Sequence, residues 1–271
     1  MIEEPRSQTP AATAESGPIV QMSQIHLAFG KKVILDGLNL NVAPRERLVI
    51  MGQSGGGKST TLRLILGILR PTGGSVRFKG EEVSRMSRSK LNRVRRRIGM
   101  VYQYSALISS LSVHDNLALP LEELTGKSEE EIDAIVNEKL SMVGMEEARD
   151  YMPAELSGGM RKRVALARAL VLEPELILFD EPSAGLDPVV SSVIDELIIS
   201  LTKKTNATSI IVTHEMDSAF RIATRMAMLY QGKIIAEDTP EHFCHSTNPV
   251  VSQFVEGRTQ GPIDTQATPQ S

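Results

Sequence analysis

The alternation of apolar and polar side chains predicts strands near the start of the chain. Short alternating stretches cover residues 24–29 and 38–42. Alternation with a period of two is typical of strands that bury one face of a sheet. We expect these strands to form an antiparallel sheet at one edge of the molecule.

Continuous apolar runs farther along the chain predict strands of a buried central sheet. These runs cover residues 48–51, 98–102, 176–179 and 209–213. Further strands are expected at 75–78, after a turn, and at 225–230 and 233–236, where Gln231-Gly232 forms a hairpin turn. Helical spacing follows the first apolar run at 60–66 and the third at 189–202. The pattern predicts an α/β fold with a mixed sheet.

A different pattern covers residues 113–172, where convincing strands are missing. Ser128 and Glu131 form a capping box, which marks the start of a helix. The apolar positions that follow, Ile132, Ile135, Val136, Leu140 and Val143, have helical spacing. We therefore expect an α-helical subdomain at about 104–172, inserted into the α/β domain.

Composition fits a globular protein, because 41% of the 271 residues are hydrophobic and 23% are charged. No apolar run approaches the roughly 18 residues of a membrane span. Residues 1–17 are polar and lack the pattern of a signal peptide. We predict a disordered leader at 1–17, a folded domain at 18–256 and a polar tail at 257–271 that is too poor in apolar groups to pack alone.

Charge and cysteine content exclude some functions. The single cysteine, Cys244, leaves no intrachain disulfide or cysteine metal cluster, and a cytosolic location is the default. A net charge of −3 argues against a general nucleic-acid-binding protein. Residues 85–97 are strongly basic and contain no acid. This stretch favours a solvated helix face, or a face near anionic lipid or a partner, over a nucleic-acid site, since no aromatic residues interleave it.

A glycine-rich loop carries the clearest chemical signal. It lies between the predicted strand 48–51 and the helix 60–66 and fits the pattern G-x-x-x-x-G-K-[ST] with Gly52, Gln53, Ser54, Gly55, Gly56, Gly57, Lys58 and Ser59. Such a loop wraps phosphates with its backbone N–H groups, the lysine reaches the β- and γ-phosphates, and the hydroxyl serves Mg²⁺. The sequence therefore predicts a P-loop NTPase core that binds a nucleoside triphosphate and Mg²⁺.

Acidic residues follow the apolar run 176–179. We expect Asp180 to reach the magnesium ion beside Ser59, and Glu181 to orient or deprotonate a water molecule against the γ-phosphate. His214 follows the next buried strand and is a candidate γ-phosphate contact, although a lone histidine is more often structural. Gln103, after the strand 98–102, is a candidate contact to Mg²⁺ or the attacking water.

The sequence Leu156-Ser157-Gly158-Gly159-Met160 opens another predicted helix. Ser157 is a good N-cap, but two glycines in the first turn weaken a helix. They make sense if the helix N-terminus must approach an anion closely.

Taken together, these motifs in this order resemble the nucleotide-binding subunit of ATP-binding-cassette transporters, over about residues 19–254. The resemblance assigns Walker A to 52–59, the glutamine loop to Gln103, the signature to 156–160 and Walker B to 176–180. It also assigns the catalytic glutamate to Glu181, the switch histidine to His214 and the D-loop to 184–187, including Asp187. Thr60 joins the nucleotide-binding residues, and Phe29 takes the place of the aromatic residue that stacks on adenine, which is usually tyrosine.

The resemblance implies ATP hydrolysis by a head-to-tail dimer. Each ATP is then held by Walker A of one copy and by Ser157 and Gly159 of the other. Closure of the dimer is the power stroke, and hydrolysis reopens it. This chain departs from the family at Met160, where glutamine is usual.

A narrower resemblance is to ATPase subunits of phospholipid transport systems of the mammalian-cell-entry type. It depends on residues 86–91, 105–107 and 113–121 and on the SGGM form of the signature. The implied partners are a permease, a periplasmic lipid-binding ring and a small regulatory protein of the sulfate-transporter and anti-sigma-antagonist (STAS) fold. The implied place is the cytoplasmic face of the inner membrane, as a peripheral protein, and the implied tail function is to reach the other ATPase subunit.

Two other functions remain to be weighed. A polar-nutrient importer ATPase, for example for amino acids, shares the core motifs. A non-transport ATPase acting on DNA or ribosomes is disfavoured. DNA-repair relatives have a long coiled coil between the phosphate loop and the signature, but no sustained heptads lie between Ser59 and Ser157. Ribosomal relatives carry two cassettes in one chain, and this chain has one.

Overall fold

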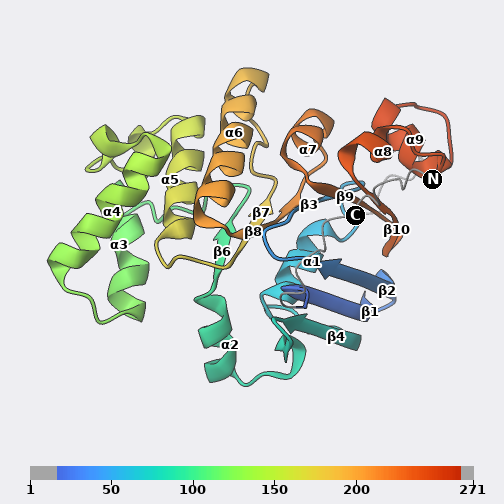
Figure 1. Ribbon diagram of the computed structural model, residues 1–271, viewed down its shortest axis with the longest axis horizontal. Coiled ribbons are helices and arrows are strands. Elements are labelled where there is room, and N and C mark those ends of the chain that lie inside the picture. The colour runs from blue at the N-terminus through green and yellow to red at the C-terminus, as the bar shows by residue number, and fades with distance from the viewer. Residues whose placement is uncertain (1–16, 264–271) are drawn as a thin grey trace, which may run out of the picture.

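The computed structural model describes residues 17–263, in which the strands form two sheets and the helices lie between and beside them (Figure 1). The predicted leader lies outside the described residues except for Gly17, and so does the tail from residue 264 onward. The proposed division at 256 stays a prediction.

The antiparallel sheet has the order β2-β1-β4-β5, with β1 at Val20–Phe29, β2 at Lys32–Val42, β4 at Gly73–Phe78 and β5 at Glu81–Glu82. The predicted edge sheet is thus confirmed, but β1 begins four residues before the expected start. The reason is an irregularity at Gln24, whose φ is 47°. Val20 and Met22 are buried before it, and Ile25 and Leu27 after it, so the alternation changes phase there.

The central sheet has the order β10-β9-β3-β8-β7-β6. Its strands are β3 at Arg47–Met51, β6 at Ile98–Val101, β7 at Leu176–Asp180, β8 at Thr208–Val212, β9 at Arg225–Tyr230 and β10 at Lys233–Asp238. Neighbouring strands run parallel except β9 and β10, which a hairpin joins through Gln231 and Gly232, both at positive φ. The predicted mixed sheet is confirmed, and its parallel strands end at one common edge.

Helices cover this sheet. They are α1 at Lys58–Ile65, α2 at Arg88–Arg95, α6 at Pro188–Thr205, α7 at Met216–Ile222, α8 at Pro240–Cys244 and α9 at Pro249–Glu256. The sequence pattern does not predict α7, α8 or α9, which are short. In α2 only Val94 is buried, so this helix lacks an apolar face long enough to recognise. Within residues 17–263, no helix is both long and apolar enough to cross a membrane.

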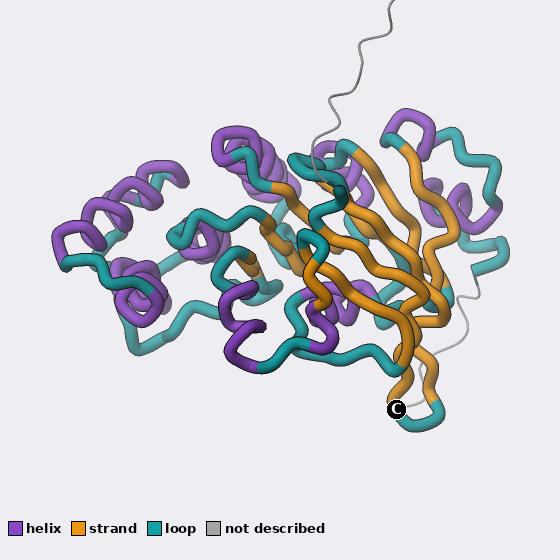
Figure 2. Tube along the Cα trace, turned by 60° about the horizontal axis from the view of Figure 1, so that its bottom comes forward, coloured by secondary structure: helices purple, strands orange, loops and turns teal. Residues whose placement is uncertain are grey.

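The predicted helical insertion is also confirmed. It consists of α3 at Val113–Leu124, α4 at Glu129–Val143, the 3₁₀ turns at Glu146–Ala148 and Pro153–Glu155, and α5 at Gly158–Leu170. The capping box of Ser128 and Glu131 starts α4 as expected. In Figure 2 this helical segment projects beyond the side of the sheets.

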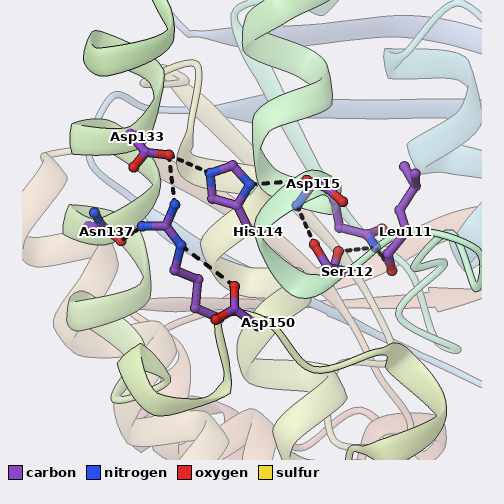
Figure 3. A network of polar contacts seen from close by, with 9 residues as sticks. Leu111, Ser112, His114, Asp115, Asp133, Asn137 and Asp150 are labelled. Carbon is purple, nitrogen blue, oxygen red and sulfur yellow. Dashed lines mark hydrogen bonds and ion pairs between the residues drawn. The ribbon is translucent and has the colours of Figure 1, made fainter.

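A polar network fixes α3 against α4 (Figure 3). The imidazole of His114 lies 2.8 Å from the carboxylate of Asp133 and 3.1 Å from that of Asp115. Arg149 donates to the same Asp133 and to Asn137, each over 2.7 Å. The pKa of Asp133 is lowered mainly by the hydrogen bond from Arg149 and to a smaller extent by the hydrogen bond with His114. The network braces one end of the helical segment.

The first residues of the predicted tail contact the domain. Ile263 is 6% exposed and packs into the main apolar core. The Gln253 side chain in α9 accepts a hydrogen bond from the N–H of Ile263 over 2.7 Å and donates one to its carbonyl over 3.3 Å. Residues 257–263 therefore close over α9.

Candidate active site

The glycine-rich loop lies between β3 and α1, where the chain has little room for side chains. Gly52 has a φ of +150°, and a Cβ there would lie 2.2 Å from the carbonyl oxygen of Leu229. Gly57 has a φ of +101° and directly precedes α1, which begins without a side-chain cap. The first N–H groups of α1 are therefore available to an anion at the loop.

Lys58 is the buried cation of the loop, with 6% of the residue exposed. Its ammonium donates to the carbonyl of Gly52 over 2.8 Å and to that of Gln53 over 3.1 Å. It also lies 3.9 Å from Oε1 of Glu181. Burial lowers the pKa of Lys58, while the charges of Glu181 and Asp180 oppose that shift. A phosphate at the loop would add the strong anionic partner that this ammonium lacks at hydrogen-bond distance.

Ser59 and Asp180 meet across the sheet edge, although they are far apart in sequence. The hydroxyl of Ser59 donates to Oδ1 of Asp180 over 2.7 Å. Parallel pairing of β7 with β8, and of β8 with β3, brings the end of β7 beside the loop after β3. A hydroxyl and a carboxylate in contact, beside a phosphate loop, fit Mg²⁺, which prefers oxygen ligands and keeps phosphate and water in its shell.

Glu181 and His214 form a second pair at the same edge. Glu181 is 8% exposed and has a φ of +52°, which is unusual for a residue with a side chain. Its Oε2 lies 2.6 Å from Nδ1 of His214 but is without a partner in hydrogen-bond geometry. The His214 side chain is 51% exposed. A buried carboxylate with a free acceptor oxygen beside the phosphate loop is suited to orient a water molecule.

The remaining candidates of this half of the site lie around the loop. Thr60 is half-buried in the first turn of α1, and Gln103 follows the end of β6. A hollow of about 590 Å³ is lined on one side by Gln53, Ser54, Gly55 and Gly56 and on the other by residues of β2. Phe29 ends β1 and is 54% exposed, so a face of its ring is accessible for stacking.

The signature residues and Asp187 do not join this cluster within one chain. Ser157 caps α5 by accepting from the N–H of Met160 over 3.2 Å, as expected. Asp187 caps α6 by accepting from the N–H groups of Val189 and Val190. In Figure 1, α5 lies among the helices on the left, separate from α1 near the centre. Within residues 17–263 no hydrogen bond or ion pair joins Ser157 or Asp187 to the phosphate loop.

The paired glycines of the signature also have a packing function inside the chain. A Cβ at Gly159 would lie 2.9 Å from Cγ1 of Val190, and one at Gly158 would lie 3.3 Å from Cδ2 of Leu186. The first turn of α5 is therefore closely packed against the segment that leads into α6. Sequence reasoning attributed the glycines to anion approach alone and missed this contact.

Two basic residues of α5 were also missed. Lys162 donates to the backbone carbonyls of Gln103 and Glu181, and Arg168 donates to those of Ser105 and Ala106. A charged residue within the buried face of a helix is the only sequence signal for Lys162. That signal does not identify the carbonyls it contacts.

Comparison with known sequences finds several similar proteins. A family model described as ABC transporter matches residues 35–184. The chain is 42% identical to the intermembrane phospholipid transport system ATP-binding protein MlaF of Haemophilus influenzae, over 90% of this chain and 93% of that protein. MlaF of Escherichia coli is 40% identical over 90% and 91%. The probable ribonucleotide transport ATP-binding protein mkl of Mycobacterium tuberculosis is 39% identical, over 94% and 72%.

Solved structures show the same architecture. A dimeric, post-hydrolysis structure of the ATP-binding cassette MJ0796 with ADP and phosphate matches with a TM-score of 0.74 and 33% identity, over 82% of this chain and 98% of that one. The structure of cbiO1 from Clostridium perfringens, part of the ABC transporter complex cbiONQ, matches with a TM-score of 0.79 and 30% identity, over 90% and 96%. The predicted fold class is thereby confirmed.

Proposed function

This chain belongs to the ABC transporter family, and from that premise we propose that it is the ATP-hydrolysing subunit of a system that moves phospholipid between two membranes. The observation that carries the proposal is the similarity to two MlaF proteins, which extends over at least nine-tenths of both partners in each pair. The contact of Ser59 with Asp180 and the nearby Glu181 and His214 provide the residues that such an ATPase needs.

In the proposed reaction, the loop 52–59 and the N-terminus of α1 bind the phosphates of ATP, and Lys58 contacts the β- and γ-phosphates. Ser59 and Asp180, with Gln103, would hold Mg²⁺, which supplies neutralisation of phosphate charge when bound. Glu181 orients the attacking water from its buried position, and His214 contacts the γ-phosphate. Phe29 stacks on the adenine.

The missing half of the site is proposed to come from a second copy. The N-terminus of α5 carries Ser157, Gly158 and Gly159. Within residues 17–263 it lies apart from α1 and the phosphate loop of the same chain (Figure 1). In a head-to-tail dimer this N-terminus would face the γ-phosphate of the other copy, with Asp187 at the interface. The similar cassette MJ0796 forms a dimer in its structure with ADP and phosphate, which supports a dimeric assembly. Because both copies then contact the γ-phosphate, ATP favours the closed dimer.

We propose that the dimer works at the cytoplasmic face of an inner membrane, bound to an integral-membrane permease. The MlaF proteins are ATP-binding subunits of transport systems, and this chain carries no membrane-crossing helix within residues 17–263. A small STAS-type regulatory protein and a periplasmic lipid-binding ring of the mammalian-cell-entry type are further proposed partners. No nucleic-acid partner is proposed.

A polar-nutrient importer is the weaker alternative. Its support is the core ATPase machinery, which importers share, and the similarity to mkl, a probable ribonucleotide transport ATP-binding protein. The chain covers 72% of mkl but 93% of the Haemophilus influenzae MlaF, so the phospholipid proteins correspond to it more completely.

The proposal is tested by purifying the chain from its native membranes together with bound proteins and identifying co-purified small molecules by mass spectrometry. We expect a permease and bound phospholipid in the wild-type complex. Recovery of a permease with a soluble solute-binding protein and no enriched phospholipid would favour the importer. The control is a mock purification from cells without the tagged chain, which measures the lipid that any membrane extract carries over.

A further inference from the structure

Lys162 is a buried lysine that connects three parts of the active site. It lies in the first half of α5 and is 5% exposed. Its ammonium donates to the backbone carbonyl of Gln103, after β6, and to that of Glu181, after β7, over 3.3 Å. Burial lowers its pKa, while Glu215 and Glu181 oppose that shift. One side chain thus links the signature helix to the backbone of the glutamine loop and to the backbone of Glu181.

The backbone of Glu181 needs such support, because its φ of +52° is costly for a residue with a Cβ. Its N–H donates to the carbonyl of Val212 over 2.9 Å. Its carbonyl accepts from Lys162 and from the N–H of Ala184, the latter over 3.3 Å. Lys162 therefore supplies one of the few bonds that hold the Glu181 backbone in a strained conformation, and the backbone determines where the carboxylate points.

The segment after Gln103 is attached to α5 in the same way. Ser105 and Ala106 both have positive φ, and Arg168 of α5 donates to their carbonyls over 2.9 and 2.7 Å. Arg168 and Lys162 both project from α5 toward this segment. The glutamine loop is thus bound to the helix whose N-terminus carries the signature, and we expect the two to move together.

We propose that Lys162 is a positioning residue for ATP hydrolysis, which ties Gln103 and the backbone of Glu181 to α5. Through the side chain of Lys162, a shift of α5 then moves the backbone of Glu181 and with it the carboxylate that orients the water. The inference rests on ATP hydrolysis at Glu181 and does not depend on which molecule is transported.

The test is the substitution Lys162→Met, which keeps an unbranched side chain, one atom shorter, and removes its hydrogen-bond donors. We expect kcat for ATP hydrolysis to fall about tenfold or more, with the Kd for ATP within about threefold of wild type, because only the geometry of the water-orienting group is disturbed. In Lys162→Gln, an amide N–H can still donate to a carbonyl, so we expect a kcat between those of wild type and Lys162→Met.

Lys139→Met is the matched control. Lys139 is also 5% exposed, but its ammonium lies against Glu138 in the helical segment, away from the phosphate loop. We expect wild-type turnover from it. Wild-type kcat in Lys162→Met would overturn the inference, and so would an equal loss of ATP binding and turnover, or a Lys162→Gln variant no faster than Lys162→Met. Glu181→Gln is measured in parallel. If that variant hydrolyses ATP at the wild-type rate, the assignment of the active site is wrong. If only Lys162→Met keeps the wild-type rate, the proposal for Lys162 alone is wrong.

Discussion

We predict that the substitution Glu181→Gln separates ATP binding from ATP hydrolysis. Glutamine has the same shape as glutamate but cannot accept a proton from water. The side chain is buried, and its Oε2 lacks a hydrogen-bond partner of good geometry. We expect the variant to bind ATP, to hydrolyse it very slowly and to accumulate as a closed dimer.

The two effects have different magnitudes. General-base catalysis contributes about 10²–10⁴-fold, so we expect kcat to fall by at least about 100-fold, or about 2.7 kcal/mol. Oε1 of Glu181 lies 3.9 Å from Nζ of Lys58. At an effective dielectric constant of about 20 this pair is worth about 4 kcal/mol before desolvation is subtracted. Without the carboxylate, Lys58 is less neutralised, and the γ-phosphate is no longer repelled. The affinity for ATP should therefore rise several-fold.

Phosphate release measures the turnover, calorimetric titration with Mg-ATP measures the affinity, and light scattering measures the dimer. Glu175→Gln is the matched control, because Glu175 directly precedes the same strand, β7, at its other end. Its carboxylate pairs with Arg97 and Lys79, each over 2.5 Å, far from the phosphate loop. A turnover of Glu181→Gln within threefold of wild type would refute the assignment of Glu181 as the group that acts on water.

Further predictions concern the loop and the ion pairs. Lys58→Ala should weaken ATP binding about 10- to 100-fold, because a charge-assisted phosphate contact worth about 1.5–3 kcal/mol is lost. Unchanged affinity in a titration would contradict the assignment of residues 52–59 as a phosphate-binding loop. Gly52→Ala should lower the free energy of unfolding by about 1–3 kcal/mol or more, since its Cβ would lie 2.2 Å from the carbonyl oxygen of Leu229; denaturant unfolding equal to wild type would contradict this close approach. Glu175→Gln should cost at most about 1 kcal/mol of stability at pH 7, because the carboxylate is partly exposed. The hydrogen bond from Arg97 lowers the pKa of Glu175, so this contribution is present above the unfolded-state pKa of about 4.3 and is lost as the pH falls through the folded-state value; a stability difference that grows in acid would refute it.

Much of the nucleotide half of the site could be predicted from the sequence, because local rules determine it. A buried strand, a glycine-rich loop and a helix follow one another without interruption, so the positions of Lys58 and Ser59 follow from the chain itself. Asp180 and Glu181 follow a continuous apolar run, and parallel pairing brings all such strand ends to one edge. The sequence predicts that Asp180 reaches a magnesium ion beside Ser59, and in the fold the hydroxyl of Ser59 donates directly to Asp180.

Other features depend on packing between distant segments, which no short pattern contains. Lys162 contacts the carbonyls of Gln103 and Glu181, and a carbonyl partner leaves no mark on the sequence. From the sequence alone, Gly159 only weakens its helix. The structure shows that Val190 packs so closely against it that a Cβ would not fit. The helix α2 was not delimited because its face is almost entirely polar. For Lys162 and Gly159 a tertiary contact, rather than local propensity, decides the structure.

The contact of Ile263 with Gln253 has a practical consequence for anyone who trims this protein. Composition invites a cut after Glu256, where the polar sequence begins. Such a truncation would expose the apolar surface beside α9 that Ile263 covers and would remove about 1.5–3 kcal/mol of stabilisation from the burial of Ile263. It would also leave the side-chain amide of Gln253 without its hydrogen bonds to the Ile263 backbone. A stable shortened version should therefore keep the chain through Ile263.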